Sequence, residues 1–368
     1  MKGDAMDTVD VTVAVTGMNA TDNPAPGVPV ARALRHEPSF KGRIVGLGYD
    51  ALDPGFYAQG LVAGGAILPF PSAGREALRE RLRWVRDELG MDVLLPNLDS
   101  ELRAIIALAP ELARAGTRTF LPSLEALERT SKVNLPRLGE HADVDIPPSQ
   151  ALLTADGIAD AASRFGLPLV VKGVYYGASV VHTEADAVAA FHRYAAQWGV
   201  PVIVQGFIPG EEYNVAALGD GRGNLAGAVA MRKMMLTDKG KGWCGVAIDN
   251  PELIRIAEAV VGALRWRGPL EVEILRSAKT GEHFVIEINP RFPAWIHLSA
   301  GAGLNLPYFA VRLALGLPLP SPLPRYRAGT LFVRISVDQI CDLATFEQLA
   351  ATGVLRAPPA FTEKVSRA

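Results

Sequence analysis

The chain has 368 residues, of which 49% are hydrophobic and 21% are charged, so it can form a large core in two or three packed subdomains and is not globally disordered. Lys and Arg number 37 against 39 Asp and Glu, which gives a net charge of −2. This balance argues against a general nucleic-acid or membrane-surface binder, because affinity for phosphate needs an electropositive surface.

The chain carries two cysteines, Cys244 and Cys341, which are too few for a disulfide framework or a Cys-rich zinc site. The N-terminal segment has no apolar run of signal-peptide length, and no uncharged stretch approaches the ~18 apolar residues of a membrane span. We therefore expect a cytoplasmic protein with no nucleic-acid or membrane partner.

The first third of the chain alternates apolar strands with helices. Residues 75–89 form the clearest amphipathic helix, with Leu78, Leu82, Val85 and Leu89 spaced by three and four. Strands separated by helices predict a parallel sheet covered on both faces. The expected domain is 1–115, with strands at 9–17, 43–48 and 92–96 and helices at 28–34, 75–89 and 100–112.

A second domain is expected over 116–320, with a lid subdomain at about 147–205. A Pro-rich linker at 316–324 then leads to a strand-containing extension, 321–368, with a strand at 330–337. Within 116–320 we expect strands at 149–154, 169–172, 180–182 and 202–207, a hairpin within 215–231, an antiparallel pair at 271–276 and 283–289, and helices at 123–130, 156–165, 185–198, 251–264 and 306–315.

The strongest chemical signal is the segment Val-Ile-Glu-Ile-Asn-Pro-Arg at 285–291. Side chains alternate along a strand, so Glu287, Asn289 and Arg291 would share one face, beside Glu273 on the neighbouring strand. Carboxylate and amide oxygens suit Mg²⁺, and an arginine can hold a phosphate or carboxylate through two bonds. The alternative is the polar outer face of an antiparallel sheet.

A second signal is Lys172, which ends an apolar strand and precedes a loop, 173–179, that contains two glycines and a serine. Backbone N–H groups of such a loop can approach phosphate oxygens while the lysine adds a positive charge. The loop does not match a Walker A motif, and a hairpin with an exposed lysine explains it equally simply.

A third signal is Gln-Gly-Phe-Ile-Pro-Gly-Glu-Glu-Tyr at 205–213. A strand, a Pro-Gly turn and a carboxylate beside an aromatic ring could form a wall for a purine and hold ribose hydroxyls. The alternative is a β-turn with solvated acids.

The order of these three segments resembles that of ATP-grasp enzymes of the carboxylate–amine ligase type, and most of all the branch that contains the carbamoyl-phosphate synthase large subunit. The resemblance covers about 121–317, and the first third is similar to the α/β domain that precedes the grasp. It implies a mixed α/β and α+β fold: a parallel α/β pre-ATP-grasp domain, then an ATP-grasp fold with a lid and an antiparallel C-terminal subdomain.

The resemblance also implies ATP and Mg²⁺ (or Mn²⁺) as cofactors and assigns roles to single residues. Arg291, Lys172 and Arg232 would be catalytic, with Lys233 beside Arg232 at the same edge of the site. The ATP-binding residues would be Lys132, Lys172, Gly177, Ser179, Gln205, Phe207, Ile208 and Glu212, and the metal ligands Glu273, Glu287 and Asn289. This chain departs from many relatives at Gly173, where they carry proline, and at the bulky Tyr175 and Tyr176.

The implied activity is ADP-forming: a carboxylate is activated as an acyl phosphate and attacked by an amine, with small molecules such as an amino acid or a peptide as substrates. Activation of bicarbonate, phosphate transfer without ligation and non-catalytic nucleotide binding remain alternatives. A homodimer is a family expectation. The acceptor pocket is expected among the segments 19–28, 234–246 and 292–301, where His297 is as plausible a packed residue as a catalytic one.

Overall fold

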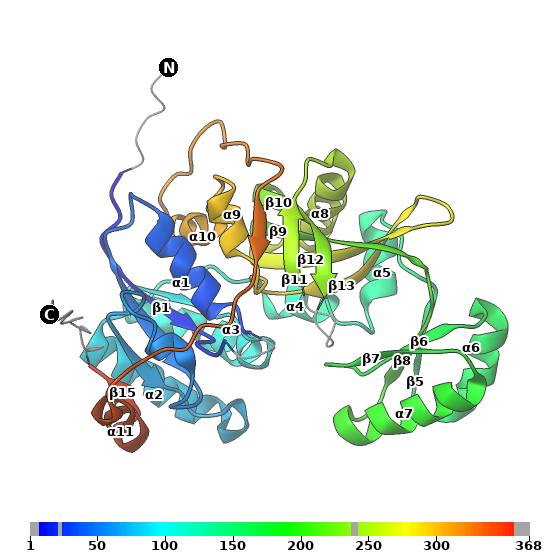
Figure 1. The fold of residues 1–368 in the computed structure, drawn as a ribbon, viewed down its shortest axis with the longest axis horizontal. Coiled ribbons are helices and arrows are strands. Elements are labelled where there is room, and N and C mark those ends of the chain that lie inside the picture. The colour runs from blue at the N-terminus through cyan, green and yellow to red at the C-terminus, as the bar shows by residue number, and fades with distance from the viewer. Residues whose placement is uncertain (1–6, 21–23, 237–241, 357–368) are drawn as a thin grey trace, which may run out of the picture.

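The computed structural model describes residues 7–20, 24–236 and 242–356, which form three β-sheets with helices packed on them (Figure 1). Along the chain, the N-terminal α/β unit comes first, the four-stranded lid follows, and the central six-stranded sheet comes after the lid. None of the helices in the described ranges is long and apolar enough to span a bilayer.

The first sheet has the strand order β15-β3-β2-β1-β4. Its four N-terminal strands, β1 to β4, run parallel, and β15 pairs antiparallel with β3. One face packs against α1, and the other against α2 and α3, because alternate residues of β1 enter two different hydrophobic clusters. The bounds are β1 (Thr12–Thr16), α1 (Gly27–His36), β2 (Arg43–Gly48), η1 (Pro54–Phe56), β3 (Gly64–Ile67), η2 (Pro71–Ala73), α2 (Gly74–Leu89), β4 (Val93–Leu95) and α3 (Asp99–Arg114).

The central sheet is antiparallel, in the order β13-β12-β9-β10-β11-β14. Helices α5 and α8 cover one face, and α9 and α10 with part of α1 pack near the other. The bounds are α4 (Leu124–Arg129), α5 (Leu135–Ala142), β9 (Gly210–Asp220), β10 (Leu225–Leu236), β11 (Gly242–Ala247), α8 (Pro251–Leu264), β12 (Arg267–Ser277), β13 (His283–Asn289), α9 (His297–Gly301) and α10 (Leu306–Ala314).

The lid is a separate four-stranded sheet, β5-β8-β6-β7, whose one face packs on α6 and α7 around its own core. In Figure 1 it lies to the right of the central sheet. Its bounds are β5 (Ser149–Leu152), η3 (Ala155–Gly157), α6 (Ile158–Phe165), β6 (Leu169–Lys172), β7 (Ala178–Val181), α7 (Glu184–Trp198) and β8 (Val202–Gly206).

The C-terminal segment is shared between two sheets. Its first strand, β14 (Leu331–Val333), pairs with β11 of the central sheet, and after α11 (Leu343–Thr352) the short β15 (Val354–Leu355) pairs with β3. The strand expected at 330–337 is therefore longer than the observed one. The backbone N–H of Arg334 still donates to the Trp243 carbonyl oxygen, but β11 begins at Gly242, so residues beyond Arg334 have almost no partner strand left to pair with. Trp243 and Cys244, expected on a loop, lie in β11.

Candidate active site

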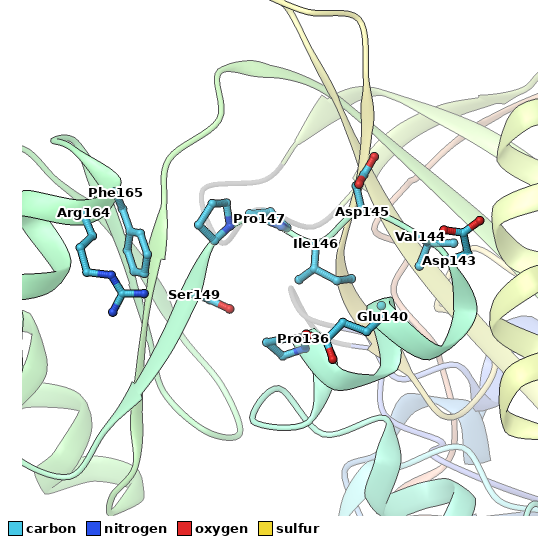
Figure 2. A pocket seen from close by; sticks show the side chains of 12 residues that line it. Pro136, Glu140, Asp143, Val144, Asp145, Ile146, Pro147, Ser149, Arg164 and Phe165 are labelled. Atoms are coloured by element: carbon cyan, nitrogen blue, oxygen red, sulfur yellow. The ribbon is translucent and has the colours of Figure 1, made fainter.

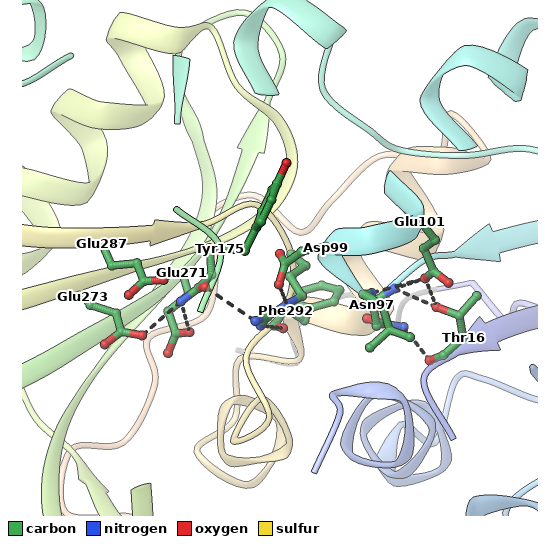
Figure 3. Close-up of polar contacts among 12 residues, drawn as sticks. Thr16, Asn97, Asp99, Glu101, Tyr175, Glu271, Glu273, Glu287 and Phe292 are labelled. Carbon is green, nitrogen blue, oxygen red and sulfur yellow. Dashed lines mark hydrogen bonds and ion pairs between the residues drawn. The ribbon is translucent and has the colours of Figure 1, made fainter. Parts of the chain in front are cut away.

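Three of the predicted residues come together on β12 and β13. Glu273 lies directly opposite Glu287 in the antiparallel register, and Asn289 lies two pairs further along, opposite Glu271. The Asn289 Nδ2 group donates hydrogen bonds of 3.0 Å to Oε2 of Glu271 and to Oε1 of Glu273. We call Glu273, Glu287 and Asn289 the acidic row; Figure 3 shows its two carboxylates beside Glu271.

Glu271 was not singled out from the sequence, although its i, i+2 spacing from Glu273 places both on one face of β12. It is buried and accepts hydrogen bonds from Trp295 Nε1 at 2.7 Å and Asn214 Nδ2 at 2.6 Å. Burial, and then the neighbouring Glu273 charge, raises its pKa. With both oxygens already bonded, Glu271 orients Asn289 rather than facing a ligand.

The donor set of the acidic row suits a hard divalent cation. In the described ranges, no group of three or more His, Cys, Asp or Glu side chains is arranged as a metal cluster. Two carboxylates and an amide oxygen leave room for water and phosphate oxygens, which Mg²⁺ commonly retains as its other ligands. The residues of the row therefore fit the metal that the resemblance implies.

Both predicted phosphate lysines reach this row. The Lys132 Nζ lies 3.4 Å from Glu287 Oε1 and donates a 3.0 Å hydrogen bond to the carbonyl oxygen of Tyr175, in the glycine-containing loop. Lys172 is buried at the end of β6, and its Nζ lies 3.4 Å from the Ile286 carbonyl oxygen. Burial lowers the pKa of Lys172, and the Glu287 carboxylate opposes that effect.

Lys233, rather than its neighbour Arg232, faces the row. Its Nζ lies 2.6 Å from Glu212 Oε2 and 3.3 Å from Glu273 Oε2. Although burial lowers the pKa of Lys233, the Glu273 and Glu212 carboxylates raise it overall. Arg232 is exposed and pairs with Tyr213, so its side chain lies on the opposite face of the sheet. The structure does not bring Arg232 to the row, which corrects its predicted catalytic placement.

Arg291 connects the central sheet to the first domain. Its Nε donates to Asp99 Oδ2 at 3.1 Å, and its Nη1 donates to the Phe292 carbonyl oxygen at 3.2 Å. Burial lowers the pKa of Arg291, but the Asp99 and Glu271 charges raise it overall. Asp99 follows the end of a parallel strand, a position that commonly faces ligands, yet the sequence did not single it out as a site residue.

The lid contributes one face of its sheet to the site. Lys172 and Gln205 lie on the same face, because Val170 pairs with Gln205 and the neighbouring Val171 turns into the lid core. Ser179 pairs with Val171, and its Oγ is bonded to the Tyr194 hydroxyl at 2.8 Å. The Ser179 side chain therefore points toward α7, and its predicted contact with ATP stays a prediction.

The remaining predicted ATP residues lie at the mouth of the site. Phe207 is 38% exposed, Ile208 is partly buried, and Glu212 is held by Lys233. Gly177 has a φ of +85°, and a Cβ there would lie 2.5 Å from Cε1 of Tyr194, so both backbone and space require glycine.

Arg334 reaches the same region from the C-terminal segment, which no sequence motif connected to the site. It follows β14 and is partly buried. Burial lowers the pKa of Arg334 and the Glu271 charge opposes this, so the two side chains lie within electrostatic reach.

Of the expected pocket segments, residues 21–23 and 237–241 lie outside the described residues. His297 packs edge-on against His36, with ring centroids 5.6 Å apart.

A cavity of about 550 Å³ lies away from this chemistry, where the chain passes from α5 into the lid (Figure 2). None of the predicted site residues lines it. Its walls come from α5, the linker and α6, and include Pro136, Glu140, Ile146, Pro147, Arg164 and Phe165.

Comparison with known proteins gives a family match for part of the chain and a fold for most of it. Residues 199–334 match the family described as ATP-grasp in the biosynthetic pathway with Ter operon. Biotin carboxylase from Campylobacter jejuni superposes with a TM-score of 0.67 at 17% identity, over 84% of this chain and 72% of that one. L-amino acid ligase from Bacillus licheniformis superposes with a TM-score of 0.62 at 18% identity, over 86% and 76%. These superpositions show that the chain has the fold of these enzymes, and its segment 199–334 is similar to the ATP-grasp family.

Curated relatives match over shorter regions. The chain is 30% identical to phosphoribosylamine–glycine ligase of Agrobacterium fabrum over 39% of its own length, and 24% identical to acetyl-CoA carboxylase 1 of Oryza sativa subsp. japonica over 61%. It spans only 36% and 11% of the lengths of these two relatives. These matches do not single out the carbamoyl-phosphate-synthase-like branch.

Proposed function

We propose that this protein is an ATP-dependent, ADP-forming ligase that activates a carboxylate as an acyl phosphate and passes it to an amine. The observation that carries the proposal is the convergence of the acidic row with Lys132, Lys172 and Arg291 at one place between the central sheet and the lid. A carboxylate needs such activation because hydroxide is a poor leaving group at neutral pH.

The residues would act mainly by positioning and by neutralising charge. Lys132 and Lys172 would offset the triphosphate charge, and Arg291 would hold the transferring phosphoryl group. Glu273, Glu287 and Asn289 would hold Mg²⁺ or Mn²⁺, which would supply positive charge to offset the negative charge of the phosphates. Gln205, Phe207, Ile208 and Glu212 would bind adenine and ribose.

Exclusion of water is a further requirement, since an acyl phosphate hydrolyses readily. The loop at 173–177 would provide it as part of the lid. Support comes from Lys132, which lies between α4 and α5. Its hydrogen bond to the Tyr175 carbonyl oxygen connects this loop to that segment. Tyr175 and Tyr176 also pack edge-on against Trp198, which braces the loop on α7.

The substrates would be a small carboxylic acid and a small amine, such as amino acids or peptides, in keeping with the names of two similar proteins, L-amino acid ligase and phosphoribosylamine–glycine ligase. Activation of bicarbonate is the second candidate, because a similar carboxylase structure is titled as a complex with MgADP and bicarbonate. Cytoplasmic location, supported by the two free cysteines, and a homodimer belong to the same proposal.

The test is trapping with hydroxylamine in the presence of Mg-ATP and a panel of amino acids, peptides and other carboxylic acids. Hydroxylamine replaces the unknown amine and converts an acyl phosphate into a hydroxamate that mass spectrometry detects. We expect one acid to give a hydroxamate together with stoichiometric ADP. ADP released with bicarbonate alone would favour the second candidate.

The matched variants are Glu287→Gln, within the acidic row, and Glu282→Gln, in the exposed turn before the same strand. We expect Glu287→Gln to reduce ADP formation by at least about 100-fold, as is typical when a charge that stabilises the transition state is removed. Glu282→Gln should retain wild-type turnover. Unchanged turnover in Glu287→Gln would refute the assignment of the row.

A further inference from the structure

The amide of Asn289 can bind a cation only through its oxygen, so its orientation decides whether it can serve the acidic row. Its Nδ2 group donates to Oε2 of Glu271 and to Oε1 of Glu273, at 3.0 Å in each case. Ionised carboxylates only accept hydrogen bonds, so both contacts require the nitrogen end of the amide. The amide oxygen lies 3.5 Å from Nη2 of Arg291, at the limit of a hydrogen bond, and keeps the capacity for a second partner.

Glu271, which holds the Asn289 amide, is itself held through its other oxygen. Its Oε1 accepts hydrogen bonds from Trp295 Nε1 at 2.7 Å and from Asn214 Nδ2 at 2.6 Å, while its Oε2 faces Asn289. Trp295, Glu271 and Asn214 are all buried. A chain of hydrogen bonds therefore runs from the indole of Trp295 through the Glu271 carboxylate to the amide of Asn289.

Asn214 shows that a donor to Glu271 is kept at a cost. Its Oδ1 is buried and has no hydrogen-bond partner in the part of the chain that the structure describes. Burial of an unpaired acceptor is unfavourable, and an apolar side chain of similar size would avoid it. What the amide contributes here is its Nδ2 bond, which indicates that the placement of the Glu271 carboxylate matters.

Trp295 lies in the turn between β13 and α9, in the same hydrophobic cluster as Phe292 and Ile296. Packing in that cluster needs only an apolar ring and does not explain the N–H group. Trp266 offers a comparison, because it is also buried and donates its Nε1 at 3.1 Å to the carbonyl oxygen of Pro269, in the cluster that α8 covers. Of these two tryptophans, only Trp295 bonds a carboxylate that contacts the acidic row.

We propose that Trp295 is a positioning residue for the metal site: its indole N–H fixes Glu271, and Glu271 fixes the Asn289 amide with its oxygen available to a divalent cation. The inference rests on the proposed function, which assigns the acidic row to Mg²⁺ or Mn²⁺. Groups that orient metal ligands in this way typically change metal affinity by ~10- to 100-fold when they are removed.

The test separates metal affinity from nucleotide affinity in Trp295→Phe, which removes the N–H group and keeps an aromatic ring. The probes are Mn²⁺-ADP, followed by the electron paramagnetic resonance spectrum of Mn²⁺, and metal-free ADP with EDTA, followed by calorimetry. Mn²⁺ should tighten ADP binding by the wild-type protein, and Trp295→Phe should lose most of this gain. The dissociation constant for metal-free ADP should change less than ~3-fold, and the KM for Mg²⁺ at saturating ATP should rise at least ~10-fold.

The matched control is Trp266→Phe, which removes an indole N–H from a backbone carbonyl oxygen and should keep the wild-type dissociation constants. Asn214→Leu removes the second donor to Glu271 Oε1 and should weaken Mn²⁺-ADP binding in the same way as Trp295→Phe. It provides the test if thermal unfolding shows that Trp295→Phe does not fold.

Two results would overturn the inference: an equal loss of affinity for ADP with and without Mn²⁺, or unchanged affinity for Mn²⁺-ADP in the folded variants. In the first case the tryptophan would only support the packing of the site. If Mn²⁺ does not tighten ADP binding by the wild-type protein, the proposed role of the acidic row fails instead, which is a distinct result.

Discussion

The Nζ of Lys233 lies 2.6 Å from Oε2 of Glu212 and 3.3 Å from Oε2 of Glu273, so one ammonium group joins three neighbouring strands, β9, β10 and β12. Lys233 is only 9% exposed at its side chain. It therefore ties the carboxylate expected to bind ribose to a carboxylate of the acidic row. The preceding residue, Arg232, lies on the other face and makes none of these contacts.

This difference predicts opposite results for two adjacent substitutions. Lys233→Met should lower ATP-dependent turnover at least about 100-fold, because it leaves Glu212 and Glu273 without their shared cation where charge must be balanced. Arg232→Met should leave turnover within about threefold. ADP release measured under saturating acid and amine checks both. Similar losses in the two variants would contradict the assignment of the two faces of β10.

Gly177 gives a prediction about the lid loop. Gly177→Ala should reduce turnover at least about tenfold, because a Cβ would meet Tyr194 at 2.5 Å in a residue whose φ is +85°. The matched control is Gly166→Ala, whose φ is +78° but whose Cβ would have no neighbour within 4 Å. It also places a side chain on a backbone with positive φ, but without the collision. Equal activity in both variants would show that the loop tolerates the displacement.

The sequence predicted those elements whose signal is local. The helix expected at 75–89 is observed at Gly74–Leu89, and the strand expected at 43–48 at Arg43–Gly48, because apolar spacing alone defines them. The short β3, with two glycines in four residues, lacks such spacing and was missed, because it forms by pairing with β2 and β15. Helix α5 was missed although Leu135, Leu138 and Ala142 are spaced by three and four, because Pro136 and Gly139 weaken the helix signal.

The site residues also differ in whether a local sequence signal predicts them. Glu273, Glu287 and Asn289 could be predicted, because strand alternation and one hairpin place them together. Asp99 and Arg291 are 192 residues apart, and Arg334 arrives from a segment that pairs with β11 only in the folded protein. No spacing rule connects such residues. The choice between Arg232 and Lys233 likewise depended on the register of β10, which the sequence leaves open.

His297 predicts a change of stability with pH. It packs against His36, and burial first, then the His36 and Arg32 charges, lowers its pKa. The unfolded chain therefore binds more protons below the ordinary histidine pKa of ~6.5. The His297 contribution to stability is present above that value and is lost as pH falls from it toward the lowered pKa of the folded state. His297→Gln should show a shallower fall of Tm between about pH 7.5 and 5.5.

The control for this measurement is His182→Gln, which replaces a solvent-exposed histidine on the lid. Its Tm should follow the wild-type dependence on pH. If His297→Gln and the wild type lose Tm in parallel, the packed histidine pair does not carry the effect.

Arg334 gives the last prediction, on recognition of the acid. Arg334 is partly buried, and its guanidinium carbon lies 5.9 Å from the centre of the Phe332 ring. Burial lowers the pKa of Arg334, and the Glu271 charge opposes that effect. A carboxylate substrate would supply more of this charge and could accept two parallel hydrogen bonds. Arg334→Met should therefore raise the KM for the acid at least about tenfold and the KM for ATP less than about threefold. Arg334→Lys should recover only part of the loss, because a lysine lacks the planar pair of donors.

The matched control is Arg327→Met, which replaces an exposed arginine that donates to the Gly301 carbonyl oxygen. Equal increases in the two KM values for Arg334→Met would assign Arg334 to the site as a whole rather than to the acid.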